Sequence, residues 1–115
     1  MALALGKPLA QGFPTNTSNT DLYTMSPANG SGAWLDKLFC CNLDTVERKV
    51  RVAWRPAAAA IASQHYLFYD VAIPANDTLE IEFRCEMPKT DVITVRVDSG
   101  STVAFNLLGR EIQNK

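Results

Sequence analysis

Residues 78–85 read Thr78-Leu79-Glu80-Ile81-Glu82-Phe83-Arg84-Cys85, and polar and apolar side chains alternate along the whole stretch. Successive side chains of a β-strand point to opposite faces, so the odd-numbered residues share an apolar face and the even-numbered residues share a polar face. A helix would mix the two kinds around its circumference. The stretch therefore predicts a strand with one face in a core and the other in water.

The same period of two recurs on both sides of this stretch. It predicts further strands at Val46–Arg55, Val92–Val97 and Thr102–Leu108. A mostly apolar strand is expected at Ala33–Asn42, an aromatic strand at His65–Ile73 and a short strand at Asp21–Met25. Turn-forming residues such as Asp98-Ser99-Gly100-Ser101 separate neighbouring strands. The alanine-rich stretch Pro56–Ser63 predicts either a turn or two of helix or a long loop across a sheet edge. The fold class is therefore all-β: an antiparallel β-sandwich of the jelly-roll or Ig-like type, with about seven strands.

The N-terminal part of the chain has a different composition. Of the first 35 residues only Lys7 and Asp21 are charged, and Ser, Thr, Asn, Gly and Pro are frequent. Ser, Thr and Asn side chains compete for backbone hydrogen bonds and disfavour a helix. Residues 1–19 are predicted to form an extended arm, and residues 20–115 the sandwich domain. Lys7 and Pro8 interrupt the apolar start, so we expect no signal peptide there.

Length and charge narrow the classes of partner. The chain has 115 residues, the size of one domain, and 11 basic residues against 12 acidic ones. No apolar run approaches the length of a membrane span. A basic cluster surrounds Trp54, but Trp54 shares the apolar face of its strand with Val50 and Val52 and is predicted to lie in the core. We therefore expect no nucleic-acid partner and no membrane partner.

Residues for catalysis are scarce. His65 is the single histidine, and no nucleophile motif surrounds it, so a hydrogen-bonded structural role is expected. Glu80 and Glu82 lie about 6–7 Å apart on one strand face, a separation that glycosidases use. Alternating outward charges also keep a sheet face soluble, which is the simpler explanation. The sequence predicts no enzyme, with no catalytic residues, no cofactor and no metal site.

The three cysteines leave two possibilities open. Cys40, Cys41 and Cys85 are an odd set, so at least one is free in a monomer. In the first, all three are small buried side chains in a reducing compartment. In the second, a disulfide forms, either between Cys85 and one of Cys40 and Cys41 or between two subunits.

Two stripes of opposite charge are predicted on different strands. Lys49, Arg51 and Arg55 form the basic stripe, and Glu80, Glu82 and Glu86 form the acidic one. If the two strands pair, the stripes make cross-strand ion pairs within the chain. If the strands lie at different edges, the stripes can meet between subunits and fix their register.

Seven segments together resemble a known group of proteins. They are Thr20–Thr24, Pro27–Gly30, Phe39–Asn42, Val50–Val52, Gln64–Leu79, Thr90–Val95 and Asn106–Ile112. In this order they are similar to small all-β structural proteins, the virion accessory proteins of tailed bacteriophages. The match covers nearly the whole chain, and the order of the segments carries it. The Cys40-Cys41 pair and Trp34 depart from the pattern.

This resemblance implies a non-enzymatic virion protein, made in the cytoplasm of the host bacterium. The expected role is a head decoration or cement protein that binds itself, as a closed oligomer such as a trimer, and binds the major capsid protein. A tail, collar or baseplate protein is the alternative. A second alternative is a module that binds host-surface carbohydrate through exposed aromatic residues such as Tyr23, Trp34 and Tyr66.

Candidate interface residues follow from the arm and from the two stripes. The arm is expected to lie across a neighbouring subunit by strand addition. The candidates are Phe13, Leu22, Tyr23, Lys49, Arg51, Arg55, Glu80 and Glu82.

Overall fold

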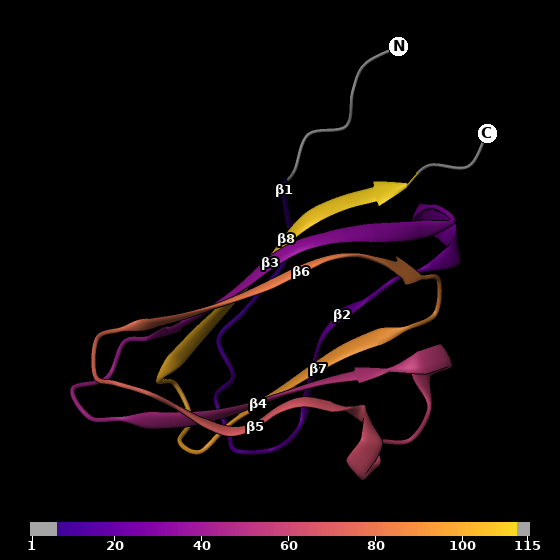
Figure 1. Cartoon of the computed structure of the whole chain (residues 1–115). Helices are drawn as coiled ribbons and strands as arrows, with labels where there is room; N and C mark the ends of the chain where they lie inside the picture. The colour runs from indigo at the N-terminus through magenta and orange to yellow at the C-terminus, as the bar shows by residue number, and fades with distance from the viewer. Residues whose placement is uncertain (1–6, 113–115) are drawn as a thin grey trace.

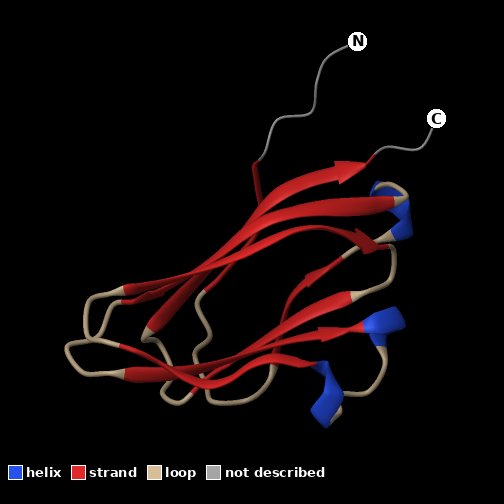
Figure 2. Cartoon of the chain, in the orientation of Figure 1, coloured by secondary structure: helices blue, strands red, loops and turns tan. Residues whose placement is uncertain are grey.

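The computed structural model describes residues 7–112 of the chain (Figure 1). They form eight strands: β1 (Lys7–Gly12), β2 (Thr20–Thr24), β3 (Gly32–Asn42), β4 (Arg48–Arg55), β5 (Tyr66–Ile73), β6 (Thr78–Pro88), β7 (Val92–Val97) and β8 (Val103–Ile112). Three 3₁₀ turns, Pro27–Asn29, Pro56–Ala58 and Ser63–His65, complete the regular structure (Figure 2). Within these residues no helix is long and apolar enough to cross a membrane.

The strands form two antiparallel sheets that stack as a sandwich (Figure 1). Sheet A has the order β1-β8-β3-β6, and sheet B has the order β2-β7-β4-β5. The prediction of an all-β antiparallel sandwich is confirmed, with eight strands in place of about seven.

The pairing pattern identifies the sandwich as a jelly roll. The first strand pairs with the last strand, and each following strand pairs with the next one inward from the C-terminus. The pairs are β1 with β8, β2 with β7, β3 with β6 and β4 with β5. This is the topology of a long antiparallel ribbon rolled into two sheets. Of the two sandwich types expected from the sequence, the jelly roll is the one formed.

The core lies between the sheets and follows the period of two. In β7, Ile93, Val95 and Val97 are buried, and in β8 Phe105 and Leu107 are fully buried. In β6, by contrast, Ile81 is buried while the other predicted inward residues are half-buried, because β6 is an edge strand. Val46 has the same even-numbered spacing as the buried Val50 and Val52, but it is 50% exposed, since β4 begins only at Arg48.

The predicted arm is partly wrong. Residues 7–12 form β1, which pairs with β8 of the same chain instead of lying on a neighbour. Leu9 and Ala10 pack against the core, and this apolar contact outweighs the scarcity of strand signals in the sequence. The domain therefore begins before residue 19. Residues 1–6 of the predicted arm lie outside the described residues.

The Pro56–Ser63 stretch forms a loop, which is one of the two alternatives predicted for it. It contains only the three-residue 3₁₀ turn Pro56–Ala58, and a second such turn begins at Ser63. Ala57 and Ala58 adopt positive φ angles of 52° and 56°, a left-handed conformation that interrupts any helix.

Candidate interaction surfaces

A bulge in β5 shapes the outer face of sheet B. Val50 lies opposite Val71 and Val52 opposite Phe68, so β5 has one residue more than β4 between them. The side chains of Tyr69 and Asp70 both meet Arg51, whose guanidinium lies 3.9 Å from the centre of the Tyr69 ring. Arg51 Nε donates to Asp70 Oδ1 at 2.7 Å, and Nη2 donates to Oδ2 at 3.2 Å. Because this pair is bidentate, it lowers the pKa of Asp70.

Arg55 ties three strands and a loop together on the same face. Its guanidinium donates to Thr94 Oγ1 at 3.0 Å, to Asp21 Oδ1 at 2.9 Å and to the carbonyl of Ala59 at 2.9 Å. Only 15% of its side chain is exposed. Arg55 therefore holds the molecule together and offers little of its charge to a partner.

A small hollow of about 60 Å³ lies beside Arg51 on this face. It is lined by Lys49, Arg51, Asp70, Arg96, Val97 and Asp98. Lys49 makes no side-chain hydrogen bond or ion pair within residues 7–112, while Arg96 donates its Nε to the carbonyl of Thr17 at 2.6 Å. Lys49 and Arg96 both add to the positive field that lowers the pKa of Asp70. Asp98 also lines the hollow and lies opposite Lys49 across the β4–β7 pair. Three basic and two acidic side chains therefore surround the hollow, and Lys49 and Arg96 make no ion pair there.

The outer face of sheet A has a different character. Five half-buried apolar side chains lie on it and form an apolar row: Trp34, Phe39 and Cys41 from β3, and Ala104 and Leu108 from β8. Two polar residues stand within this row, Lys37 opposite Leu108 and Asn106 opposite Phe39. Their neighbours in β3, such as Leu35, Leu38 and Cys40, are fully buried on the inward side. Among the described residues no element covers this face (Figure 1). Apolar side chains that meet water on an open sheet are a common mark of an interaction surface.

Polar groups border the apolar row. Trp34 Nε1 donates to Asp36 Oδ1 at 2.9 Å, and the Arg110 guanidinium lies 5.6 Å from the centre of the Trp34 ring. Lys37 Nζ lies 2.6 Å from Glu80 Oε1 across the pair of strands β3 and β6. Apolar side chains with charged groups among them and beside them are also found on protein–protein interfaces.

The acidic stripe lies on β6, at the edge of sheet A, and the basic stripe lies on β4, in sheet B. The cross-strand alternative is therefore wrong, because the two strands belong to different sheets. Glu80 pairs with Lys37, whereas Glu82 and Glu86 make no ion pair within the described part of the chain. Whether the stripes meet between subunits stays a prediction.

The eight candidate interface residues do not form one surface. Tyr23 is only 8% exposed, and its hydroxyl donates to Glu111 Oε2 at 2.8 Å, so it is a core residue and not an exposed one. Leu22 is half-buried and packs against the core. Phe13 is 45% exposed beside a cavity of about 320 Å³ in the β1–β2 connection. The three residues differ in burial because the two sheets cover them to different extents. The alternation along one strand does not show this.

The aromatic residues proposed to bind sugar are also dispersed. Tyr23 is in the core, Trp34 is on the outer face of sheet A, and Tyr66 stacks edge-on against Tyr69 at 4.9 Å in sheet B. Trp54, predicted as core, is half-buried and donates its Nε1 to Asp91 Oδ2 at 2.8 Å. These positions do not support a shared stacking platform.

Groups that support catalysis are not gathered in residues 7–112. His65 has the structural role expected of it, since its Nδ1 accepts a hydrogen bond from the Ala62 amide at 3.1 Å. No group of three or more His, Cys, Asp and Glu side chains there is able to hold a metal ion.

All three cysteines are free. Cys40 lies opposite Leu79, and Cys85 lies opposite Leu35, so five to six residues along the β3–β6 pair separate them. That is about 16–20 Å, far beyond the reach of a disulfide. Cys41 points to the opposite face from Cys40. The intrachain disulfide alternative is therefore wrong.

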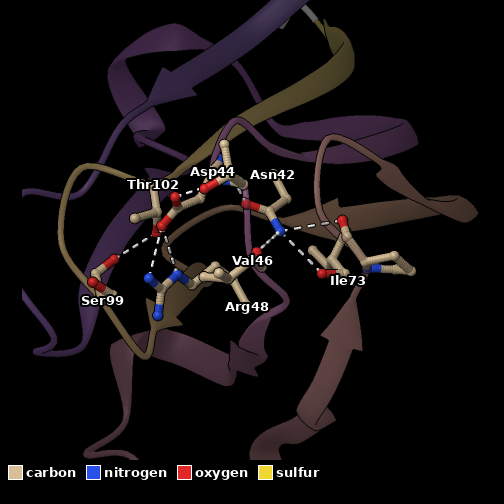
Figure 3. Close-up of polar contacts among 9 residues, drawn as sticks. Asn42, Asp44, Val46, Arg48, Ile73, Ser99 and Thr102 are labelled. Carbon is tan, nitrogen blue, oxygen red and sulfur yellow. Dashed lines mark hydrogen bonds and ion pairs between the residues drawn. The ribbon is translucent and has the colours of Figure 1, made fainter.

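A buried polar cluster closes one end of the sandwich (Figure 3). Asn42 is fully buried, and its Nδ2 donates to the carbonyls of Val46, Ile73 and Pro74 at 2.9, 3.0 and 3.2 Å. Its Oδ1 accepts from the Asp44 amide at 2.9 Å. Sequence reasoning missed this residue, because nothing in the local pattern distinguishes it from other turn asparagines.

One feature of the sequence indicates an apolar outer face on β3. The stretch Ala33–Asn42 is apolar at both odd and even positions, so both of its faces are apolar. In a strand of a two-layer sandwich only one face can meet the core.

Comparison of the chain with protein-family models, with curated proteins and with solved structures finds no match.

Proposed function

We propose that the chain is a non-enzymatic structural protein of a tailed-bacteriophage particle. It decorates the head by binding to copies of itself and to major capsid subunits. The resemblance of the sequence to virion accessory proteins motivates the proposal. The jelly roll is compatible with it, since that architecture recurs in viral capsid proteins, although the same fold also serves unrelated functions.

The observation that carries the proposal is the apolar row on the outer face of sheet A. Trp34, Phe39 and Leu108 are its largest side chains, and Lys37 and Asn106 stand beside them on the same face. Burying these side chains against another protein removes apolar surface from water, which favours binding. A flat surface of this kind suits another protein better than a small substrate, which prefers a concave pocket.

Particle binding tests the proposal. Phage particles made without the gene that encodes the chain are separated into heads and tails, and labelled protein is added to each. We expect wild-type protein to saturate heads. Phe39→Glu is expected to bind heads at least about tenfold more weakly, because an interface would have to bury its carboxylate.

Leu67→Glu is the matched control, since Leu67 is 47% exposed on β5 of the other sheet, away from the apolar row. It should bind heads as the wild type does. Saturation of tails alone would replace the head placement by the tail, collar or baseplate alternative. Equal binding by Phe39→Glu and wild type would exclude the apolar row as the contact, and no binding to either particle part would contradict a virion function.

A further inference from the structure

Charged groups without an ion partner gather on two separate surfaces of the sandwich. Lys49 and Arg96 line the hollow on sheet B, and Glu82 and Glu86 lie on the edge strand β6 of sheet A. Within residues 7–112 none of these four side chains makes an ion pair. The other charges of both stripes are already matched: Arg51 by Asp70, Arg55 by Asp21 and Glu80 by Lys37.

The geometry of the hollow suits a single carboxylate. Arg51 lies opposite Arg96 on the neighbouring strand, so Lys49 is the diagonal neighbour of Arg96. Diagonal neighbours are about 7–8 Å apart at the backbone, so one anionic group can reach both long side chains. In the hollow, Lys49, Arg51 and Arg96 exceed Asp70 and Asp98 by one charge, and one added carboxylate would balance that charge. The volume of about 60 Å³ leaves no room for an extended ligand.

The acidic side is presented for contact. β6 is an edge strand with no neighbour on one side, and Glu82 and Glu86 are both exposed. Glu82 stands about 6.6 Å from Glu80 along the strand, the same step that separates Lys49 from Arg51 along β4. This step is common to all strands, Arg84 lies between Glu82 and Glu86, and Lys37 lies opposite Glu82. The two stripes are therefore complementary in net charge.

We propose that the occupant of the hollow is a second copy of this chain, whose Glu82 enters between Lys49 and Arg96. Glu86 of the same copy adds to the negative field that faces the basic surface. The two contacting patches are different, so the interface is heterologous and builds a ring or an open filament. A closed ring would satisfy the hollow and the acidic stripe of every copy. This inference rests on the self-association in the proposed function and specifies its contacts.

Charge reversal tests the contact in the full-length protein. One variant carries Lys49→Glu and Arg96→Glu, and the other carries Glu82→Lys and Glu86→Lys. The mass of each in solution is measured by light scattering at low salt, with circular dichroism to verify folding. We expect wild type to be oligomeric, and each variant alone to dissociate with a dissociation constant raised at least about tenfold.

Mixing the two variants provides the decisive test. In an equimolar mixture each variant complements the other, so oligomers in which the two variants alternate should return. The protein that carries all four changes should also self-associate. Lys89→Glu is the matched control, since Lys89 is an exposed lysine in the β6–β7 turn and away from the hollow. Added salt should weaken the wild-type oligomer, because exposed charges are screened.

The outcomes separate this inference from the proposed function. Wild-type protein that is monomeric at all concentrations, or variants that associate as tightly as wild type, would overturn the charge contact. So would two folded variants whose mixture stays monomeric. In each case binding of wild-type protein to heads would still support the virion role. A charge contact without any particle binding would overturn the virion role instead.

Discussion

At the scale of single residues, a few buried polar groups hold the connections of the sandwich in place. Asn42 binds the β3–β4 loop and the β5–β6 turn through four hydrogen bonds (Figure 3). Asp91 plays a similar part at the other end, where it accepts from Trp54 Nε1 and from the Ala57 amide, both at 2.8 Å. Buried polar groups with all their partners specify one arrangement of loops, and removal of one partner leaves the others unsatisfied.

Asn42→Ala is expected to lower the free energy of unfolding by about 2–3 kcal/mol, because buried carbonyls lose their donor. Asn42→Asp should cost at least as much, since a carboxylate would face three carbonyl oxygens. Urea denaturation measures both. Asn19→Ala, at an exposed asparagine, should change stability by less than about 0.5 kcal/mol. Equal effects at the two positions would contradict the role of Asn42.

Ala57→Gly is expected to raise the free energy of unfolding by about 1 kcal/mol. The φ angle of Ala57 is 52°, a conformation that costs alanine roughly 1–2 kcal/mol and glycine very little. Ala60→Gly is the control: Ala60 does not have a positive φ, so it should gain nothing and lose a few tenths of a kcal/mol. Thermal and urea unfolding of both variants measure the difference. A loss at both positions would argue against backbone strain at Ala57.

The cysteines are expected to react at very different rates. Burial raises the pKa of Cys40 to about 12, and its side chain is fully buried, so it should react with a thiol reagent only on unfolding. Cys41, half-buried on the open face of sheet A, should react first. Mass spectrometry of partly modified native protein identifies the sites. Cys41→Ser should remove the fast phase, and modification of Cys40 at the rate of Cys41 would contradict the fold.

At the scale of elements, the edges of the two sheets are shaped by bulges. β1, β2 and β5 each shift register against their partners, and the β3–β6 pair shifts near Asp36. Each bulge interrupts the row of free backbone groups that an edge strand offers to other chains. In β5 the bulge also has a local effect, since it brings Tyr69 and Asp70 to Arg51.

Hydrogen exchange distinguishes β1 from an arm. Amides in residues 9–12 that bond to β8 should exchange slowly, while amides in the exposed connection 15–19 should exchange at nearly the rate of an unfolded peptide. Amides at 92–97, in the centre of sheet B, provide the reference for full protection. Equal, fast exchange over 9–12 and 15–19 would restore the arm that the sequence suggested.

At the scale of the whole molecule, the two outer faces of the sandwich differ in chemistry. Sheet A presents the apolar row, and sheet B presents basic and acidic groups that are mostly paired with each other. The near-zero net charge of the chain therefore hides a separation of charge between surfaces. Two unlike faces suit a protein that contacts two kinds of surface, which agrees with the proposed assembly role.

Acid is expected to destabilise the whole molecule through two ion pairs. Hydrogen bonds from Arg48 lower the pKa of Asp44, and those from Arg51 lower the pKa of Asp70. Below about pH 4 the unfolded chain takes up protons first, so stability falls as the pH drops toward the lowered pKa values of the folded state. Above about pH 5 these two groups should contribute no pH dependence.

Urea denaturation between pH 6 and pH 2 measures this effect. Asp70→Asn should be less stable than wild type at pH 6 and should lose less stability on acidification, because one of the two carboxylates no longer titrates. Asp98→Asn is a suitable comparison, since the Asp98 side chain makes no ion pair within residues 7–112. An acid dependence of Asp70→Asn equal to that of wild type would exclude the Arg51–Asp70 pair as a source.

The sequence by itself determined the all-β class and the position of seven strands, because the period of two is a local property that each segment shows alone. It also indicated the structural role of His65. Only the tertiary structure decided that residues 7–12 are a strand, since their partner β8 lies almost a hundred residues further along the chain. The jelly-roll order, the core position of Tyr23 and the separation of the two charge stripes depend on which strands pair, and pairing is a long-range property that no single segment contains.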